Sequence, residues 1–273
     1  MSSPLRNKTV FITGSSRGIG KAIALRLARE GAQIIVAAKS VTEDPRLGGT
    51  IYSAAREIEE AGGRALPVVC DIRDESQIEE AVSKGVEHFG SLDIVINNAS
   101  AISLSHIEKT ETKKFDLMYD INVRGTFFVT KACIPHLLKS SHAHVLSLSP
   151  PLQLDMKWFS PHPAYTISKY DMSMITLSVS NAYPNKIAAN TLWPKTVIGT
   201  SALQILPGGE QLLAGSRRPA IVADAAYEIL KKSPDSCSGH SFIDEEVLAA
   251  AGITDLSAYA YSPGHTLIPD LFM

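Results

Sequence analysis

Tyr165 and Lys169 stand four residues apart in the stretch AYTISKY. On a helix this spacing places two side chains on one face, with their Cβ atoms about 5–6 Å apart. A phenol has an ordinary pKa near 10, which is too high for a good base at neutral pH, but a neighbouring cation favours the phenolate and lowers that pKa. The pair is therefore a candidate for moving a proton to or from a substrate oxygen. An ordinary exposed helix face is the alternative.

A glycine-rich turn, TGSSRGIG, follows an apolar run and opens a helical pattern. Glycines permit a tight turn and let the backbone approach a pyrophosphate, whose charge is stabilised by free amides at the helix N-terminus. The strand before and the helix after supply the context that a dinucleotide site requires; a plain glycine-rich turn is the alternative. The turn residues expected to contact the dinucleotide are Gly14, Ser15, Ser16, Arg17, Gly18, Ile19 and Gly20.

The end of the second predicted strand, QIIVAAKS, bears on which dinucleotide binds. A carboxylate there would accept hydrogen bonds from a ribose 2′-hydroxyl, whereas cations suit a 2′-phosphate. The strand ends in Lys39 with no carboxylate before Glu43, and Arg17 lies in the glycine turn, so the sequence favours NADP(H) over NAD(H). Both cations could instead be solvated surface charges. Asp71, in VVCDIRD, could hold an adenine edge or could equally be a turn or N-cap residue.

Six short apolar runs alternate with helical patterns along the chain. Each run is rich in β-branched or apolar residues and is typical of a strand buried on both faces. The runs are TVFIT, QIIVAA, ALPVVC, LDIVIN, AHVLSLS and IAANTLW. Apolar residues three and four apart predict helices over residues 19–29, 51–61, 76–89 and 115–138. This alternation predicts a single doubly wound α/β (Rossmann) domain over residues 1–273, with a parallel sheet, helices on both faces and ligands at the carboxyl ends of the strands.

Composition excludes several classes of partner. The 273 residues carry a formal net charge of −2, with 45% hydrophobic and 20% charged residues, which offers no basic field for nucleic acid. No apolar stretch approaches the roughly 18 residues that cross a bilayer, and no secretory leader begins the chain, so we expect a cytoplasmic protein with no membrane partner. Cys70, Cys133 and Cys237 are widely spaced and predict buried thiols, with no disulfide framework and no metal site.

Three motifs in register resemble the short-chain dehydrogenase/reductase family, whose pattern is TGxxxGxG, NNAG and YxxxK. The chain has TGSSRGIG at 13–20, NNAS at 97–100 and YTISK at 165–169, and the resemblance covers about residues 8–245. More narrowly, TIYSAAREIEEAGG, LSPPL and LWPKT are similar to hydroxysteroid dehydrogenase-like proteins, which animals carry fused to a sterol-carrier domain, and to bacterial citronellol/citronellal dehydrogenases. No sterol-carrier module is expected here, because the chain stops at YSPGHTLIPDLFM.

The resemblance implies hydride transfer between NADP(H) and a carbonyl/alcohol pair, with Tyr165 as the general acid/base. Lys169 would lower the pKa of Tyr165 and bond the nicotinamide ribose. In the family a serine, usually the second of an SS pair, polarises the substrate oxygen, but here Pro150 takes that place. Ser149 is the candidate for the role, and Ser147, on the same strand face, is the weaker alternative. A vacant role would leave a dinucleotide-binding regulatory protein with weak or no catalysis.

The resemblance also assigns roles to three further positions. The backbone carbonyl of Asn122 would hold a water that links Lys169 to solvent, although a buried asparagine satisfied by its neighbours is the alternative. Asn98 would position the sheet end near the cofactor. Thr196 in WPKT would contact the nicotinamide carboxamide. Lys195 stands where the family commonly has a glycine, so the resemblance does not predict the backbone turn at this position.

The segment 197–218 is predicted to be a substrate lid. Its apolar residues are Ile198, Leu203, Ile205, Leu206, Leu212 and Leu213. They are consistent with a hydrophobic alcohol or aldehyde as substrate, or simply with a packed helix. Trp158 and Phe159 could line the same pocket. The resemblance further implies a homodimer or homotetramer formed through helix faces.

Overall fold

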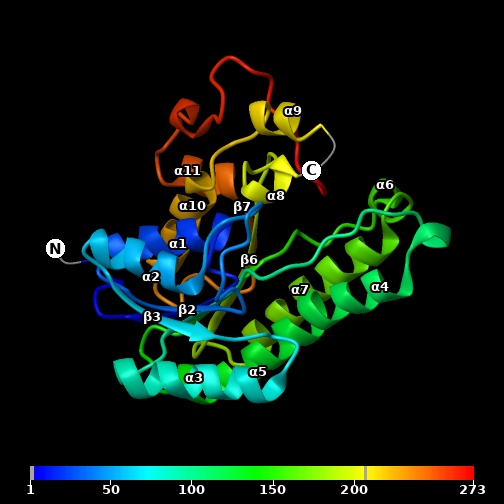
Figure 1. Cartoon of the computed structure of the whole chain (residues 1–273). Coiled ribbons are helices and arrows are strands. Elements are labelled where there is room, and N and C mark those ends of the chain that lie inside the picture. The colour runs from blue at the N-terminus through cyan, green and yellow to red at the C-terminus, as the bar shows by residue number, and fades with distance from the viewer. Residues whose placement is uncertain (1–2, 206–207) are drawn as a thin grey trace.

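The computed structural model describes residues 3–205 and 208–273, and a parallel β-sheet runs through its centre (Figure 1). Seven strands in this part of the chain follow the order β3-β2-β1-β4-β5-β6-β7, and every neighbouring pair is parallel. The strands are β1 (Thr9–Thr13), β2 (Gln33–Ala38), β3 (Arg64–Val69), β4 (Ile94–Asn97), β5 (His144–Leu148), β6 (Ala188–Trp193) and β7 (Ser241–Ile243). The order reverses direction beside β1, so the predicted doubly wound fold is confirmed.

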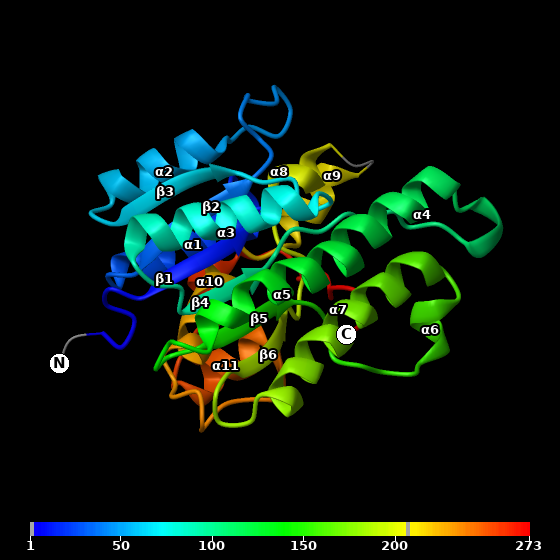
Figure 2. The same ribbon diagram turned by 90° about the horizontal axis from the view of Figure 1, so that it is seen from below.

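Helices cover both faces of this sheet (Figures 1 and 2). One face carries α1 (Gly18–Arg29), α2 (Ile51–Glu60), α10 (Ala220–Leu230) and α11 (Asp244–Ala250). The other carries α3 (Glu75–Phe89), α5 (Thr126–Leu137) and α7 (Pro163–Ala182). The connections contain α4 (Thr112–Met118), α6 (Met156–Phe159), α8 (Ser201–Gln204), α9 (Gly209–Ala214) and the short 3₁₀ turns η1 (Ile107–Lys109) and η3 (Ser257–Tyr259).

The central strand feeds two separate cores because its side chains alternate between the faces. Val10 and Ile12 of β1 pack with α1 and α10, whereas Phe11 packs with α3 and α5; all three side chains are fully buried. Burying a side chain of this size stabilises the fold by about 1.5–3 kcal/mol. The sheet is therefore a rigid base for the loops that leave its carboxyl edge.

The helix predicted over residues 115–138 is not continuous. It divides into α4, a π-helical turn η2 (Tyr119–Gly125) and α5. A π turn inserts one extra residue into the helical ladder, and such turns are frequent at functional sites. Asn122 lies buried inside this turn.

At the edges of the sheet, one prediction was wrong and one strand was missed. The third strand was expected to be buried on both faces, but β3 pairs with β2 alone and its ends, Arg64 and Val69, are exposed. β7 was not predicted, because its three residues are too few to form a pattern. The other five predicted strands and the first three helices are confirmed, with ends that differ by a residue or two.

The remaining general expectations concern thiols and membranes. Cys70, Cys133 and Cys237 are free and buried, as expected. Within residues 3–205 and 208–273, no helix is both long and apolar enough to traverse a bilayer.

Candidate active site

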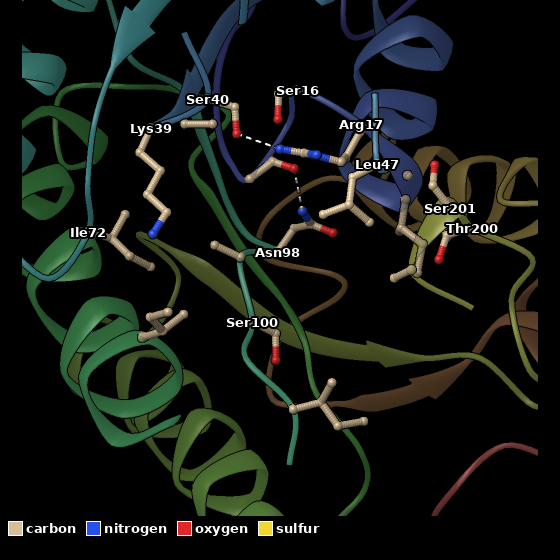
Figure 3. A pocket seen from close by; sticks show the side chains of 18 of the residues that line it. Ser16, Arg17, Lys39, Ser40, Leu47, Ile72, Asn98, Ser100, Thr200 and Ser201 are labelled. Atoms are coloured by element: carbon tan, nitrogen blue, oxygen red, sulfur yellow. Dashed lines mark hydrogen bonds between the residues drawn. The ribbon is translucent and has the colours of Figure 1, made fainter. Parts of the chain in front are cut away.

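A cavity of about 500 Å³ opens at the carboxyl ends of β1 to β4 (Figure 3). It lies where the strand order reverses, which is where doubly wound sheets bind ligands. Nine predicted site residues line it: Gly14, Ser16, Arg17, Gly18, Ile19, Lys39, Asp71, Asn98 and Tyr165. Six others lie outside the cavity lining: Ser15, Gly20, Asn122, Ser149, Lys169 and Thr196.

The glycine turn between β1 and α1 is held by Asn98 (Figure 3). Its side-chain amide donates hydrogen bonds to the carbonyl oxygens of Thr13, at 2.9 Å, and Gly14, at 3.2 Å. Gly14 has φ +65°, in the left-handed region that glycine adopts without strain. A Cβ on Gly20 would lie 2.5 Å from Asn98 Nδ2 and 2.7 Å from the Gly14 oxygen. Asn98 thus joins the end of β4 to the turn, and Gly20 has no room for a side chain.

The first turn of α1 leaves its backbone N–H groups without a side-chain cap. Arg17 is the N-cap residue with extended backbone, its side chain makes no capping hydrogen bond, and no acidic residue stands in the first turn. Free amides and the helix dipole favour an anion at such an end. The Ser15 hydroxyl donates inward to the Ile12 oxygen at 2.8 Å, so the side chain of Ser15 turns away from the cavity.

Arg17 and Ser40 contact each other at the end of β2, and the Lys39 side chain extends from the same strand end toward Ile72 (Figure 3). Arg17 Nη2 donates to Ser40 Oγ at 2.6 Å, and its buried Nη1 has no hydrogen-bond partner among the described residues. Leaving a buried charged donor unpaired is unfavourable, because the group has lost its water. The arrangement therefore fits an anionic acceptor such as a phosphate group.

The connection from β2 to α2 folds back over the glycine turn. Gly49 has φ +72°, and a Cβ there would lie 2.6 Å from the Ser16 oxygen, so the two loops touch backbone to backbone. Leu47 reaches the cavity wall. The loop ends where Thr50 and Ser53 form a capping box at the start of α2, with Ser53 N donating to Thr50 Oγ1 at 3.0 Å.

Asp71 lines the cavity as a turn residue. Its carboxylate accepts a two-point hydrogen bond from Arg73, with Arg73 Nε 2.9 Å from Oδ1 and Nη2 2.5 Å from Oδ2. The hydrogen bonds from Arg73 lower the pKa of Asp71, so it is ionised at neutral pH. The N-cap of α3 is Asp74 instead. Of the three interpretations of Asp71, the N-cap is thus wrong.

Helix α7 holds the end of β5 through two hydrogen bonds one helical turn apart. Lys169 Nζ donates to the Leu148 oxygen at 2.6 Å, and Ser173 Oγ donates to the Pro150 oxygen at 2.7 Å. Ser149 lies between these two acceptors, fully buried, and its hydroxyl has no partner in the part of the chain that is described. A buried hydroxyl left unpaired costs about 1–3 kcal/mol. The Ser149 hydroxyl is therefore an unused hydrogen-bonding group at the carboxyl end of β5, just outside the cavity lining.

Ser147, the alternative to Ser149, is already engaged. Its hydroxyl accepts a hydrogen bond from Thr176 Oγ1 at 2.6 Å and another from Asn97 Nδ2 at 3.3 Å. Asn97 Nδ2 also donates to Thr130 Oγ1 at 3.1 Å. Ser147 therefore belongs to a buried polar network beneath the strand ends.

The predicted lowering of the Tyr165 pKa by Lys169 is not found in the structure. Burial raises the pKa of the Tyr165 phenol, and the carboxylate of Asp270 raises it further. Burial also lowers the pKa of Lys169 to about 7. The lysine donates to Leu148, and its Nζ lies 5.1 Å from the centre of the Trp193 ring. An apolar environment disfavours the charged forms of both groups.

Asn122 is satisfied by its neighbours, as the alternative interpretation held. Its Oδ1 accepts from Ala101 N at 2.8 Å and from Ser100 Oγ at 3.1 Å. Its Nδ2 donates to the Ala101 oxygen at 2.9 Å and to Ser168 Oγ at 3.0 Å. The side chain therefore ties the loop after β4 to α7. Ser100, one of its partners in that loop, lies on the cavity wall. The water-holding role of its backbone carbonyl stays a prediction.

Thr196 follows β6 with its Oγ1 buried and unpaired among the described residues. Lys195 N donates to Asp244 Oδ1 at 2.9 Å, which fixes the backbone turn where the family commonly has a glycine. Thr196 also pairs as an isolated antiparallel bridge with Pro269. A distant segment of the chain thus reaches the end of β6.

The segment predicted to be a lid contains α8 and α9. Residues 200–202, at the start of α8, line the cavity. Ile198 and Leu213 are buried, whereas Ile205 is 49% exposed. Leu206 lies outside the described residues. Trp158 does not line the cavity; its ring centre lies 5.6 Å from that of Phe272.

Comparison with known proteins shows what this arrangement belongs to. The family model for short chain dehydrogenases matches residues 8–206. This chain belongs to the short-chain dehydrogenase family. It is 57% identical over 265 residues to hydroxysteroid dehydrogenase-like protein 2 of Xenopus laevis and 53% identical to the protein of that name in Homo sapiens. Each alignment covers 97% of this chain and 63% of the relative, so the chain spans less than two thirds of their length.

Solved structures agree with this membership. A putative dehydrogenase from Xanthomonas campestris is 49% identical, with a TM-score of 0.95 and 98% of both chains covered. A short chain dehydrogenase from Mycobacterium thermoresistibile is also 49% identical, with a TM-score of 0.93 and coverage of 98% of this chain and 96% of the other. The family is one of oxidoreductases whose fold binds a nicotinamide dinucleotide.

Sequence reasoning missed several residues of this short-chain dehydrogenase site. Ser40 directly follows Lys39 and could have been found from that position, and the adjacent Gly48 and Gly49 signalled a turn without showing where it packs. Asp270 and Phe272 carried no signal, because their contacts with the site span roughly a hundred residues of sequence. Across the described ranges there is no group of three or more His, Cys, Asp or Glu residues that could hold a metal ion.

Proposed function

We propose that this chain is a cytoplasmic oxidoreductase that transfers a hydride between NADP(H) and the carbonyl/alcohol group of a hydrophobic small molecule. The observation that supports it best is the buried, unpaired Ser149 hydroxyl, which lies between two hydrogen bonds from the helix that bears Tyr165 and Lys169. We infer that this hydroxyl bonds a substrate oxygen, because buried hydroxyls are rarely left without a hydrogen-bond partner.

The residues present fit NADP(H). The glycine turn and the open N-terminus of α1 would hold the pyrophosphate, and the unpaired Arg17 Nη1 with Lys39 would hold a 2′-phosphate. The unpaired Thr196 Oγ1 would bond the carboxamide, and Lys169 the ribose. When bound, the dinucleotide supplies or accepts the hydride.

The protein's own groups handle the substrate oxygen and its proton. Ser149 Oγ donates a hydrogen bond to that oxygen and polarises the carbonyl. Tyr165 is a neutral phenol at pH 7 because burial raises its pKa, so its proton is available for donation to the developing alkoxide. Lys169, with its pKa lowered to about 7, can take up or release a proton near neutral pH. Asn122 keeps the loop that carries Ser100 against α7, beside these groups.

The test is turnover of NADPH with medium-chain aldehydes and ketones, followed by cofactor absorbance. Tyr165→Phe is expected to lower kcat by about 10²–10⁴-fold or more with little change in NADPH affinity, because only the phenol proton is lost. Tyr170→Phe is the matched control: Tyr170 lies in the same helix, and its hydroxyl donates to the Gln153 oxygen at 2.7 Å. This control should keep its turnover while losing about 1 kcal/mol of stability. Full activity in Tyr165→Phe would refute the assignment.

The competing function is a dinucleotide-binding regulatory protein. It is favoured by Pro150 in place of the family serine and by the Lys169 ammonium being engaged with Leu148. The same assay separates the two functions. Tight NADPH binding with no turnover of any carbonyl compound would support the regulatory protein.

We propose a second copy of this chain as the partner of the α5–α7 face (Figure 2). Phe127, Leu138 and Met174 are 51%, 45% and 50% exposed there. Large apolar side chains clustered on one face mark an association surface in soluble proteins.

A further inference from the structure

The connection from β2 to α2, residues 41–50, is a loop that is closed at its base. Ile51 N donates a hydrogen bond to the Ser40 oxygen at 3.0 Å, so the two ends of the loop meet. Arg17 of the glycine turn donates to the Ser40 hydroxyl at 2.6 Å. Compact surface loops of this length with adjoining ends are Ω-loops, which are frequently functional. The base of this loop is attached to the turn that would hold the pyrophosphate under the proposed function.

Asp44 fixes the conformation at the tip of the loop. Its Oδ1 accepts hydrogen bonds from Arg46 N at 2.8 Å and Leu47 N at 3.2 Å, and its backbone oxygen accepts one from Gly48 N at 2.8 Å. Such bonds from an aspartate to the backbone that follows it stabilise a tight turn. Gly48 and Gly49 then have φ +64° and +72°, a region that glycine adopts without strain. The chain therefore turns back directly after Leu47.

The returning part of the loop rests on the glycine turn. A Cβ on Gly49 would lie 2.6 Å from the Ser16 oxygen and 3.2 Å from Arg17 Cβ, so the two segments are in direct contact there. Leu47, two residues earlier, lines the cavity together with Ser16 and Arg17 (Figure 3). The loop thus carries an apolar side chain onto the cavity wall beside the glycine turn.

The Leu47 side chain is not part of a hydrophobic core. It is half-buried, and among the residues that the structure describes it neither belongs to one of the hydrophobic clusters nor packs against one. Ile19, which lines the same cavity, does pack against the core shared by α1 and α10. An apolar side chain gains free energy when it is removed from water. For Leu47, a molecule bound in the cavity would complete that burial.

The surroundings of Leu47 indicate which half of the dinucleotide it would meet. Under the proposed function, Arg17 and Lys39 hold the 2′-phosphate and the glycine turn holds the pyrophosphate, and the loop of Leu47 contacts that turn. Tyr165, beside which the hydride would be exchanged, lines the cavity from α7 instead. The adenosine half therefore lies nearest to Leu47. An apolar cover there excludes water, which strengthens the attraction between phosphate and cations.

We propose that Leu47 is a cofactor-binding residue that covers the adenosine half of NADP(H), so that the loop 41–50 slows release of the dinucleotide. This inference rests on the proposed function and deepens it by adding a contact from outside the glycine turn and the strand ends. Leu47 acts by excluding water and by contacting the bound molecule, so no proton or hydride transfer is assigned to it.

The test measures NADPH release and the binding of each half of the dinucleotide separately. Stopped-flow fluorescence gives the rate of NADPH dissociation. Calorimetry gives the Kd for 2′,5′-ADP, which is the adenosine half with its 2′-phosphate, and for reduced nicotinamide mononucleotide, which is the other half. In Leu47→Ala we expect the dissociation rate and the Kd for 2′,5′-ADP each to rise about tenfold, since each buried methylene changes affinity about fourfold. The Kd for the mononucleotide should not change.

Two further variants control for general effects. Leu47→Met keeps an apolar side chain of similar volume and should retain the constants of the unaltered chain within about twofold. Val41→Ala is the matched control, because Val41 lies in the same loop, is 43% exposed and is not part of the cavity lining. This variant should leave the dissociation rate and both Kd values unchanged.

The outcomes separate this inference from the proposed function. If the unaltered chain binds neither NADPH nor 2′,5′-ADP, the proposed function fails and this inference fails with it. If the unaltered chain binds both, but Leu47→Ala has the same dissociation rate and Kd values as Val41→Ala, then Leu47 is only a loop residue and this inference alone is overturned. A loss of affinity for the mononucleotide, with none for 2′,5′-ADP, would place Leu47 at the other half and overturn it as well.

Discussion

Replacing Gly20 by alanine should distort the glycine turn and weaken its binding of the dinucleotide. The added Cβ would stand 2.5 Å from Asn98 Nδ2 and 2.7 Å from the Gly14 oxygen, both closer than carbon can approach. Relief requires Asn98 to move, which weakens its hydrogen bonds to the oxygens of Thr13 and Gly14. Each bond is worth about 1 kcal/mol, overpacking costs about 1–3 kcal/mol, and alanine returns about 1 kcal/mol of helix propensity. We expect a net loss of about 1–3 kcal/mol in the free energy of unfolding.

We expect Gly20→Ala to weaken dinucleotide binding more clearly than it destabilises the fold. The displaced turn carries the amides of α1, so we expect the Kd for NADPH, measured by fluorescence titration, to rise about tenfold or more, which corresponds to about 1.4 kcal/mol. Gly85→Ala is the matched control: Gly85 is also a helical glycine, but its Cβ would meet the flexible end of Ile35 on the other face of the sheet. Urea unfolding measures stability in both variants. A folded Gly20→Ala with unchanged Kd, or an equal change of Kd in Gly85→Ala, would refute the reasoning.

Three further predictions concern charge. Lys39→Asp should shift the ratio of NADPH to NADH affinity toward NADH by about 10–100-fold, because a charge-assisted bond to phosphate is worth about 1.5–3 kcal/mol; Lys84→Asp, on exposed α3 surface, should leave the ratio unchanged, and an unaltered ratio in Lys39→Asp would exclude it from the site. The stability should rise with pH between about 7 and 10.5, because burial lowers the pKa of Lys169 to about 7 while the unfolded lysine stays protonated. The buried Asp270, with its pKa raised to about 7, should lower stability as pH rises from about 4 to 7. Urea unfolding across pH tests both signs, and the same slope above pH 7 in Lys169→Met would contradict the first.

Local sequence patterns sufficed where a short segment decides its own structure. The glycine turn is such a case, because Gly14 and Gly20 both pack closely against the residues that follow β4, where a Cβ would have little or no room. Strands buried in the sheet were found from their apolar runs. The edge strand β3 was mistaken for a central one because an apolar run does not show how many neighbours a strand has.

Long-range contacts could not be read from the chain. The π turn around Asn122 breaks a helical pattern that looks continuous in sequence, because the extra residue is accommodated by bonds to Ala101 and Ser168. Phe272 looks like any residue of an irregular segment until the fold places it against Tyr165. The pKa of Tyr165 was predicted from its spacing to Lys169, whereas burial is the largest influence on the pKa values of both groups.

Under the proposed function, the position of Ser149 explains how a serine could serve the site despite Pro150. Ser149 follows the last residue of β5 and Pro150 follows Ser149, so both lie where the strand leaves the sheet. Proline lacks an N–H but keeps its carbonyl, and that carbonyl accepts the hydrogen bond from Ser173. The bond from Lys169 to Leu148 lies on the other side of Ser149. Because α7 holds the backbone on both sides, Pro150 costs the strand end no anchoring bond, and the Ser149 hydroxyl remains both buried and free.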